Sequence, residues 1–228
     1  MVDVNAQIQA VERGVETTER HGQAVRVQRL AQEYPATIHD TWNAVTTERI
    51  SRWFLPISGD LEVGGRYQLE GNAGGVVREC RPPADGDASY HATWEFGGNV
   101  TWITVRLTET GDQRTRLELE HVARIADVPD DMWEQFGPSA TGIGWDSGFL
   151  GLGLHLGSAV DGPTPEEGVA WMMSDEGKSF TRASAKEWEG AHVAAGADPA
   201  AAARAAAATA AMYLGEAPHD MGEAPAPA

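Results

Sequence analysis

The pattern of apolar and polar residues changes its period near Pro56. Beyond this residue, apolar and polar side chains alternate in six short segments, which is the pattern of half-buried β-strands. Glycine- and proline-rich stretches separate the segments, and such short connections favour antiparallel neighbours. The predicted strands are residues 59–63, 66–70, 76–81, 89–96, 101–108 and 115–123. A further strand near Val25 completes a predicted sheet of seven strands.

Helical spacing marks the segments on either side of these strands. Apolar residues recur every three or four positions from Val4 to Val15, which predicts an N-terminal helix within residues 1–22. Residues 35–54 carry the pattern of two shorter helices. A long helix is predicted over residues 139–156 despite its five glycines, because large apolar residues share one face there.

Alternation also predicts which side chains face the core. In the last predicted strand, Leu117, Leu119 and His121 share one face, and charged residues occupy the other. The charged face belongs in solvent, so the two leucines and His121 are expected to point inward. In the strand before it, the same argument turns Trp102 outward, unless a bulge or a covering element intervenes.

The composition changes after Gly157. Helix-start signals at Thr164, Ser174 and Asp198 predict a helical extension over residues 158–215 that packs on a main domain of residues 23–157. Its few aromatic residues cannot build a separate core. The last stretch, residues 216–228, is rich in Pro, Ala and acidic residues and is expected to be a disordered tail.

Charge and cysteine content narrow the partners and the compartment. The 228 residues carry a formal net charge of −17, with a pI near 4.7, which disfavours nucleic acid and anionic membranes as partners. Cys80 is the single cysteine, so an internal disulfide is impossible and a reducing compartment is expected. Neither a signal peptide nor an apolar run of about 20 residues is evident. A cytoplasmic, soluble protein is predicted.

A series of short motifs in a fixed order resembles one known family. The motifs are Trp42-Asn43-Ala44-Val45-Thr46, Arg52-Trp53-Phe54, Asp60-Leu61-Glu62-Val63-Gly64-Gly65, Trp94-Glu95-Phe96, residues 101–107, residues 115–121 and Gly144-Trp145. Together they span about 130 residues. They resemble the activator of Hsp90 ATPase homologue 1-like branch of the SRPBCC superfamily, whose members share a START/Bet v 1-like fold. The extensions at both ends resemble those of a subset of bacterial members.

The resemblance implies an α+β helix-grip fold, in which a seven-stranded antiparallel sheet curls around a long C-terminal helix, here residues 139–156. Proteins of this superfamily hold hydrophobic ligands between the sheet and this helix. Some are polyketide cyclases or aromatases, some bind lipids or hormones, and a few bind Hsp90. The fold therefore leaves the function open.

The titratable residues give little chemistry. The seven histidines are scattered without metal-ligand spacing, no dinucleotide fingerprint is present, and neither a metal nor a cofactor is predicted. His121 and Asp146 are the candidates for acid–base catalysis, His121 because it faces a predicted cavity and Asp146 because it follows Trp145 on the long helix. The more ordinary alternatives are a hydrogen-bonded core histidine and a solvated aspartate.

The predicted ligand-binding residues are mainly aromatic, which suits a flat, apolar ligand. They are Trp53, Phe54, Tyr67, Trp94, Phe96, Leu117, Leu119, His121, Trp145, Gly148 and Phe149. The favoured function is binding of a hydrophobic small molecule between the sheet and the long helix. Two alternatives stay open: a cyclase-, aromatase- or hydratase-like enzyme using His121 or Asp146, and a protein-interaction module of the Hsp90 co-chaperone kind. The N-terminal apolar stripe could pack on its own domain or on a second copy of the chain, and the second alternative predicts a homodimer.

Overall fold

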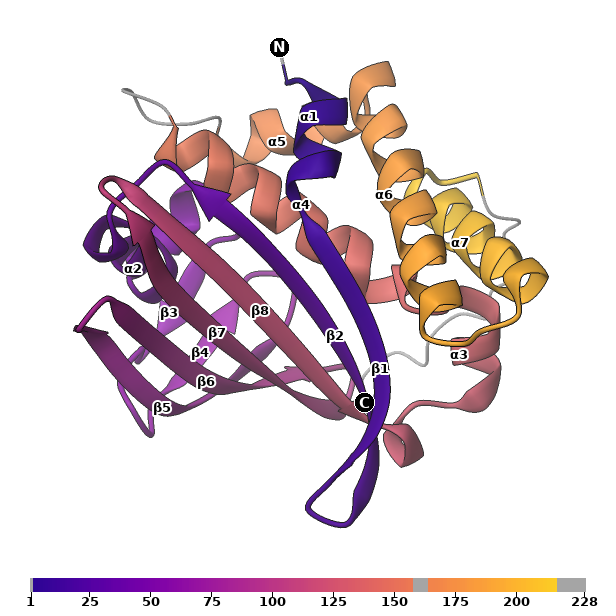
Figure 1. Ribbon diagram of the computed structural model, residues 1–228, viewed down its shortest axis with the longest axis horizontal. Coiled ribbons are helices and arrows are strands. Elements are labelled where there is room, and N and C mark those ends of the chain that lie inside the picture. Colours follow the sequence, from indigo (N-terminus) through magenta and orange to yellow (C-terminus); the bar gives the residue numbers. More distant parts are fainter. Residues whose placement is uncertain (1, 158–163, 217–228) are drawn as a thin grey trace.

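A computed structural model describes residues 2–157 and 164–216. Its described residues form one antiparallel sheet of eight strands in the order β1-β2-β8-β7-β6-β5-β4-β3, which curls around a helix (Figure 1). The strands are β1 Glu12–Arg20, β2 Gln23–Tyr34, β3 Ile57–Gly59, β4 Arg66–Leu69, β5 Gly74–Ala84, β6 Asp87–Phe96, β7 Asn99–Gly111 and β8 Arg114–Arg124. The helix-grip architecture is confirmed, with one strand more than the sequence predicts.

The additional strand is β1, which the sequence analysis wrongly assigned to a helix within residues 1–22. Helix α1 covers only Val4–Ala10, and β1 then pairs along its whole length with β2. The two strands meet at His21 and Gly22, both with positive φ, as a two-residue hairpin turn requires. Val11 and Val15 fit a helical stripe and a strand equally well, because residues four apart share a face in both structures.

The first strand of the predicted meander is also displaced. The prediction placed it at residues 59–63, whereas β3 is Ile57–Gly59 and the following residues turn towards β4. The remaining strands lie where alternation predicts them, and β5 is longer than expected. Trp102 lies on the outer face, as predicted, against Val25, Val27 and Val122. The Arg124 guanidinium stacks over its ring, with Cζ 5.0 Å from the centroid.

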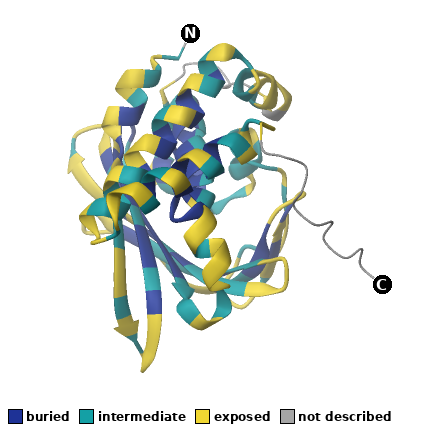
Figure 2. Cartoon of the chain, turned by 90° about the vertical axis from the view of Figure 1, so that its right-hand side faces the viewer, coloured by how far each residue is buried: buried dark blue, intermediate teal, exposed yellow. Residues whose placement is uncertain are grey.

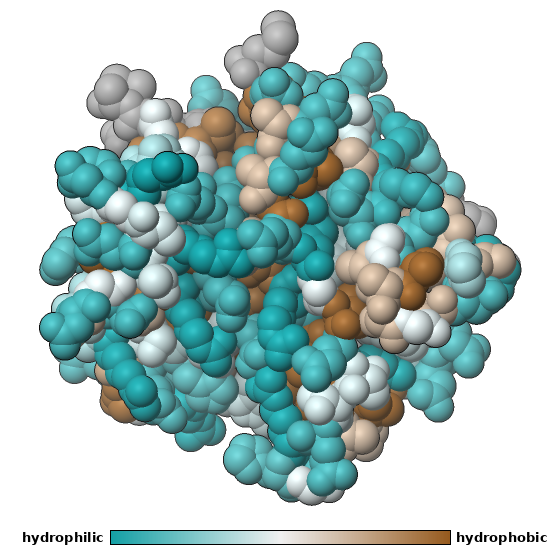
Figure 3. All heavy atoms as spheres, viewed as in Figure 1, coloured by the Kyte–Doolittle hydropathy of each residue, from teal (hydrophilic) through white to brown (hydrophobic). Residues whose placement is uncertain are grey.

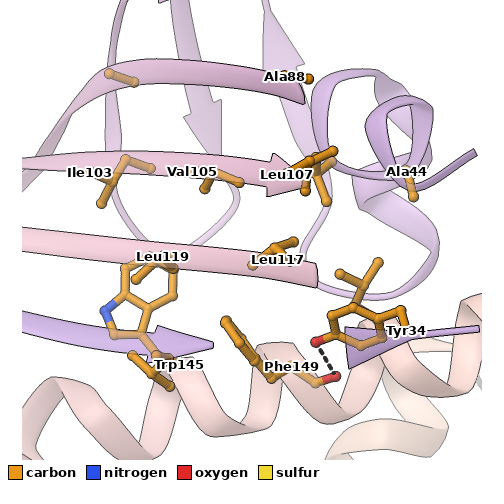
Figure 4. Packing of buried hydrophobic residues seen from close by; sticks show 14 of the residues in the cluster. Tyr34, Ala44, Ala88, Ile103, Val105, Leu107, Leu117, Leu119, Trp145 and Phe149 are labelled. Carbon is orange, nitrogen blue, oxygen red and sulfur yellow. Dashed lines mark hydrogen bonds between the residues drawn. The ribbon is translucent and has the colours of Figure 1, made fainter. Parts of the chain in front are cut away.

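Helix α4, Ser139–Leu156, has the predicted bounds and crosses the inner face of the sheet. Trp145 and Phe149 rise from it towards apolar residues of β7 and β8 (Figure 4). These are Ile103, Val105, Leu107, Leu117 and Leu119, so the predicted inward face of β8 is confirmed. The Tyr34 hydroxyl donates to the Phe149 carbonyl oxygen at 3.1 Å and ties β2 to the same helix.

Shorter helices close the two ends of this layer. Helix α2, Ile38–Thr46, begins at a Thr37 cap, and the 3₁₀-helix η1, Glu48–Arg52, follows it. At the other end, η2, Ile125–Asp127, and α3, Asp130–Phe136, connect β8 to α4. The sequence analysis did not predict η2 or α3, which have three and seven residues and are too short for a helical period to repeat.

The C-terminal helices are α5 Pro165–Met172, α6 Asp175–Ala194 and α7 Pro199–Tyr213. Helix α6 lies against α1, β1 and α4, and its Phe180 and Trp188 are fully buried. Figure 2 views the molecule from the side of these helices and colours each residue by its burial. We propose on this basis that the predicted extension is an integral layer of a single domain. Residues 158–163 and the predicted disordered tail beyond Glu216 lie outside the described residues.

The surface seen in Figure 3 is largely hydrophilic, with hydrophobic side chains in several small groups, one of them at the right, where Figure 1 places the alanine-rich helix α7. None of the helices in residues 2–157 and 164–216 combines the length and apolar content needed to cross a membrane.

Candidate functional site

A cavity of about 210 Å³ lies between the inner face of the sheet and α4. Helix α2, η1 and the segment leading to β3 complete its wall. Its lining is Trp42, Val45, Thr46, Ile50, Trp53, Phe54, Ile57, Leu61, Tyr67, Leu69, Val77, Cys80, Tyr90, Ala92, Trp94, Ile103, Val105, Leu117, Leu119, Trp145, Gly148, Phe149 and Leu152. The lining formed by these described residues contains no charged side chain.

Aromatic rings dominate the wall. The rings of Trp94 and Trp145 are tilted against each other, with centroids 4.7 Å apart, and join β6 to α4. Trp42 meets Tyr90 edge-on at 6.4 Å. Such surfaces favour flat apolar molecules, because rings gain from stacked and edge-to-face contacts beyond the burial of area.

Two glycines of α4 allow the segment that follows η1 to pack closely against this helix. A Cβ atom on Gly151 would lie 2.3 Å from the Trp53 carbonyl oxygen, so only glycine permits this close approach. The Trp53 indole N–H donates to the Ala44 carbonyl oxygen at 2.9 Å and fixes the other side. A Cβ atom on Gly148 would lie 3.5 Å from the Phe54 ring, which is an ordinary contact distance, and its absence leaves room in the cavity. The glycine-rich helix thus shapes the site through missing side chains.

Most of the predicted ligand-binding residues border the cavity. They are Trp53, Phe54, Tyr67, Trp94, Leu117, Leu119, Trp145, Gly148 and Phe149. The placement of Phe96 is wrong, because its side chain is 60% exposed at the β6–β7 turn. The motif Trp94-Glu95-Phe96 puts both aromatics on one face, but the strand ends at Phe96 and the core does not reach that far.

His121 is buried behind Trp145 and does not border the cavity. Its Nδ1 accepts a hydrogen bond from the Trp145 indole N–H at 3.1 Å, so the ring proton sits on Nε2. Nε2 in turn donates to Thr101 Oγ1 at 2.8 Å. Burial lowers the pKa of His121 from 6.5 to about 4, which keeps the ring neutral at physiological pH. The geometry makes His121 a residue that orients Trp145.

Asp146 faces away from the cavity, towards β1 and α6. Its carboxylate lies 3.0 Å from the Arg13 guanidinium, with both side chains at most 4% exposed. Ser184 Oγ and the Trp188 indole N–H also donate to Oδ2. Burial raises the pKa of the carboxyl, and the positive charge of Arg13 and these hydrogen bonds oppose the rise. Asp146 therefore joins the N-terminal strand, α4 and α6 at one buried point.

The sequence analysis missed several lining residues, among them Tyr90, Cys80 and Trp42. Tyr90 shares a face with Trp94, because the two are four residues apart on β6. Extending the inward face of Trp94 back along the strand would have identified it. Cys80 is the register partner of Tyr90 on β5, a pairing that the sequence alone does not give.

No three His, Cys, Asp or Glu side chains of the described part of the chain gather in a group that could hold a metal ion. The polar groups of the cavity are hydroxyls, a thiol and indole N–H groups, which suit neutral organic ligands.

Comparison with known proteins identifies the family. The sequence model described as "Activator of Hsp90 ATPase homolog 1-like protein" matches residues 35–152, which is 118 of the 228 residues. The chain therefore belongs to this family, within the helix-grip class that its fold defines. No curated protein sequence matches the chain.

Solved structures extend the likeness beyond the matched segment. The crystal structure of CalU16 from Micromonospora echinospora is 28% identical, with a TM-score of 0.58 over 80% of this chain and 98% of that one. The solution structure of the same protein is 27% identical, with a TM-score of 0.62 over 82% and 97%. EF2215 from Enterococcus faecalis, of unknown function, shares the fold at 14% identity, with a TM-score of 0.52 over 75% and 95%.

Proposed function

We propose that the protein binds a small hydrophobic molecule in the cavity between its sheet and α4. The observation that carries the proposal is a space of about 210 Å³ whose described lining is aromatic and aliphatic and bears no charge. An apolar cavity of roughly 150 Å³ is large enough for benzene. The space in this protein suits a ligand of about two fused rings.

The positions of the acid–base candidates favour binding over catalysis. His121 and Asp146 are both absent from the described lining, and each is engaged in buried hydrogen bonds. A general acid or base must reach the proton that it transfers, directly or through one water molecule. Trp145 stands between His121 and the cavity, and Asp146 points to the opposite side of α4.

Filling the cavity from α4 tests the proposal. We expect Gly148→Leu to reduce naphthalene binding at least about a hundredfold, because the new side chain occupies the space beside Phe54. Replacing a helical glycine favours the helix by up to about 1 kcal/mol, which offsets local crowding. Isothermal titration calorimetry measures the affinity, and circular dichroism checks the fold.

Gly190→Leu is the matched control, since Gly190 lies on the exposed face of α6 with no atom within 4 Å of a built Cβ. It should bind naphthalene like the wild type. Undiminished binding by folded Gly148→Leu would contradict the location of the site. A role confined to the surface, such as the activation of the Hsp90 ATPase that the family's description names, would be unaffected by either substitution.

Cys80 provides a second test, because it is the single cysteine and borders the cavity. Burial raises the pKa of its thiol, so alkylation by N-ethylmaleimide at neutral pH should be slower than that of an exposed cysteine. Saturating naphthalene should slow the reaction at least about tenfold further by blocking access. Intact mass spectrometry follows the adduct. An alkylation rate that is unchanged by the ligand would place the ligand elsewhere.

A further inference from the structure

We infer that the ligand is uncharged and that the hydroxyl of Tyr90 forms its principal hydrogen bond. This inference rests on the proposed function, because it concerns the same cavity. It adds the chemical class of the ligand and a specificity-determining residue that the sequence motifs do not identify.

Tyr90 stands on the inner face of β6, opposite Val105 on β7 and Cys80 on β5. Its ring lies edge-on to Trp42, and its side chain borders the cavity. The hydroxyl makes no hydrogen bond to any residue in the described part of the chain. Burial and the neighbouring Cys80 thiol raise the pKa of the phenol, so it stays protonated at neutral pH. It can therefore both donate and accept a hydrogen bond.

The other hydroxyls of the lining already have partners. Tyr67 donates to the Thr93 carbonyl oxygen at 2.6 Å, and Thr46 donates to the Trp42 carbonyl oxygen at 2.7 Å. The indole N–H groups of Trp42 and Trp94 also make no hydrogen bond to the described residues, but an indole can only donate. Tyr90 is thus the hydroxyl of the described lining that a ligand can pair with, whether the ligand offers a hydroxyl or a carbonyl group.

The lack of charge in the described lining indicates that the ligand is uncharged. A ligand carboxylate or ammonium would leave water without meeting an opposite charge, which is strongly unfavourable. A neutral hydroxyl or carbonyl needs only the one hydrogen bond that Tyr90 supplies. The ligand class is therefore a neutral, mainly aromatic molecule with a hydrogen-bonding group at one end.

Three probes of equal ring size test this assignment: naphthalene, 2-naphthol and 2-naphthoate. With the wild-type protein at pH 7, 2-naphthol should bind about tenfold more tightly than naphthalene, the gain expected of one neutral hydrogen bond. The naphthoate anion should bind at least about a hundredfold more weakly than 2-naphthol. Calorimetric titration gives the three dissociation constants.

Tyr90→Phe should bind naphthalene as tightly as the wild type. It should lose the preference for 2-naphthol, so that the dissociation constants of 2-naphthol and naphthalene become about equal. Tyr213→Phe is the matched control, because Tyr213 on α7 does not border the cavity and its hydroxyl donates to the Ala140 carbonyl oxygen at 3.0 Å, and it should keep the tenfold preference. Retained naphthalene binding shows that each variant is folded with its cavity intact.

Two results would overturn the inference: a tenfold preference that persists in Tyr90→Phe, or naphthoate binding equal to that of 2-naphthol. Both leave the proposed function standing. The proposed function fails by a different result, in which none of the three probes binds to the wild-type protein, and the inference then fails with it.

Discussion

Asp146→Ala is expected to lower the free energy of unfolding by about 3–5 kcal/mol. The substitution leaves the Arg13 guanidinium buried without its counter-charge, and it removes the acceptor of Ser184 and Trp188. Among the described residues, Arg13 then keeps only the carbonyl oxygens of Ile8 and Val11 as acceptors, at 3.0 and 2.8 Å. Urea unfolding followed by circular dichroism measures the loss. Amide hydrogen exchange should rise first in α6, which this cluster holds against α4.

Two controls separate the buried charge from a general effect of losing an ion pair. Glu79→Ala breaks a pair with Arg81 in which both side chains are more than 60% exposed, and it should change stability by less than about 1 kcal/mol. The double variant Arg13→Met/Asp146→Leu removes both charges and should recover most of the loss, since apolar replacements of buried pairs are often tolerated. Equal losses in the single and double variants would contradict the electrostatic explanation.

Acidification is expected to destabilise the protein through His121 by about 2 kcal/mol at pH 5 and about 3 kcal/mol at pH 4, relative to pH 7. Its pKa is about 4 in the folded protein and 6.5 when unperturbed. Between these values the unfolded chain binds a proton at His121 that the folded chain does not. Stability therefore rises with pH across this window and is lost as pH falls from 6.5 to 4.

The physical cause is the fixed hydrogen-bond direction. Nδ1 must accept from Trp145, so a proton on that nitrogen breaks the bond and places a charge in the core. His121→Gln keeps an acceptor and a donor but does not titrate. Between pH 7 and pH 5, the free energy of unfolding of this variant should therefore fall by about 2 kcal/mol less than that of the wild type. Urea unfolding at the two pH values measures the difference. Parallel pH dependence of the wild type and the variant would show that other groups are responsible.

The elements with strong local signals were predicted correctly. The bounds of α4 agree with the structure, because Trp145, Phe149 and Leu152 repeat at helical spacing and outweigh the unfavourable propensity of the glycines. The inward face of β8 is correct because charged residues cannot share the core with Leu117 and Leu119. Most of the aromatic lining follows from the same rule together with the family resemblance.

The errors occur where a residue has two physically acceptable environments. Val11 and Val15 suit a helix or a strand, and only pairing with β2 selects the strand. From the sequence, Asp146 could be a solvated or a catalytic carboxylate. Its buried ion pair with Arg13 of β1, which only the tertiary structure shows, gives it a structural role. Phe96 alternates correctly but lies at a turn beyond the reach of the core.

The sequence by itself determined the fold class, the long glycine-rich helix and the side of the sheet that would be apolar. Periodicity carries these features because each depends on neighbours within a few residues. The tertiary structure decided the position of β1, the partners of His121 and Asp146, and the availability of the Tyr90 hydroxyl. Each of these depends on contacts between residues far apart in the chain, whose distances and directions no local pattern contains.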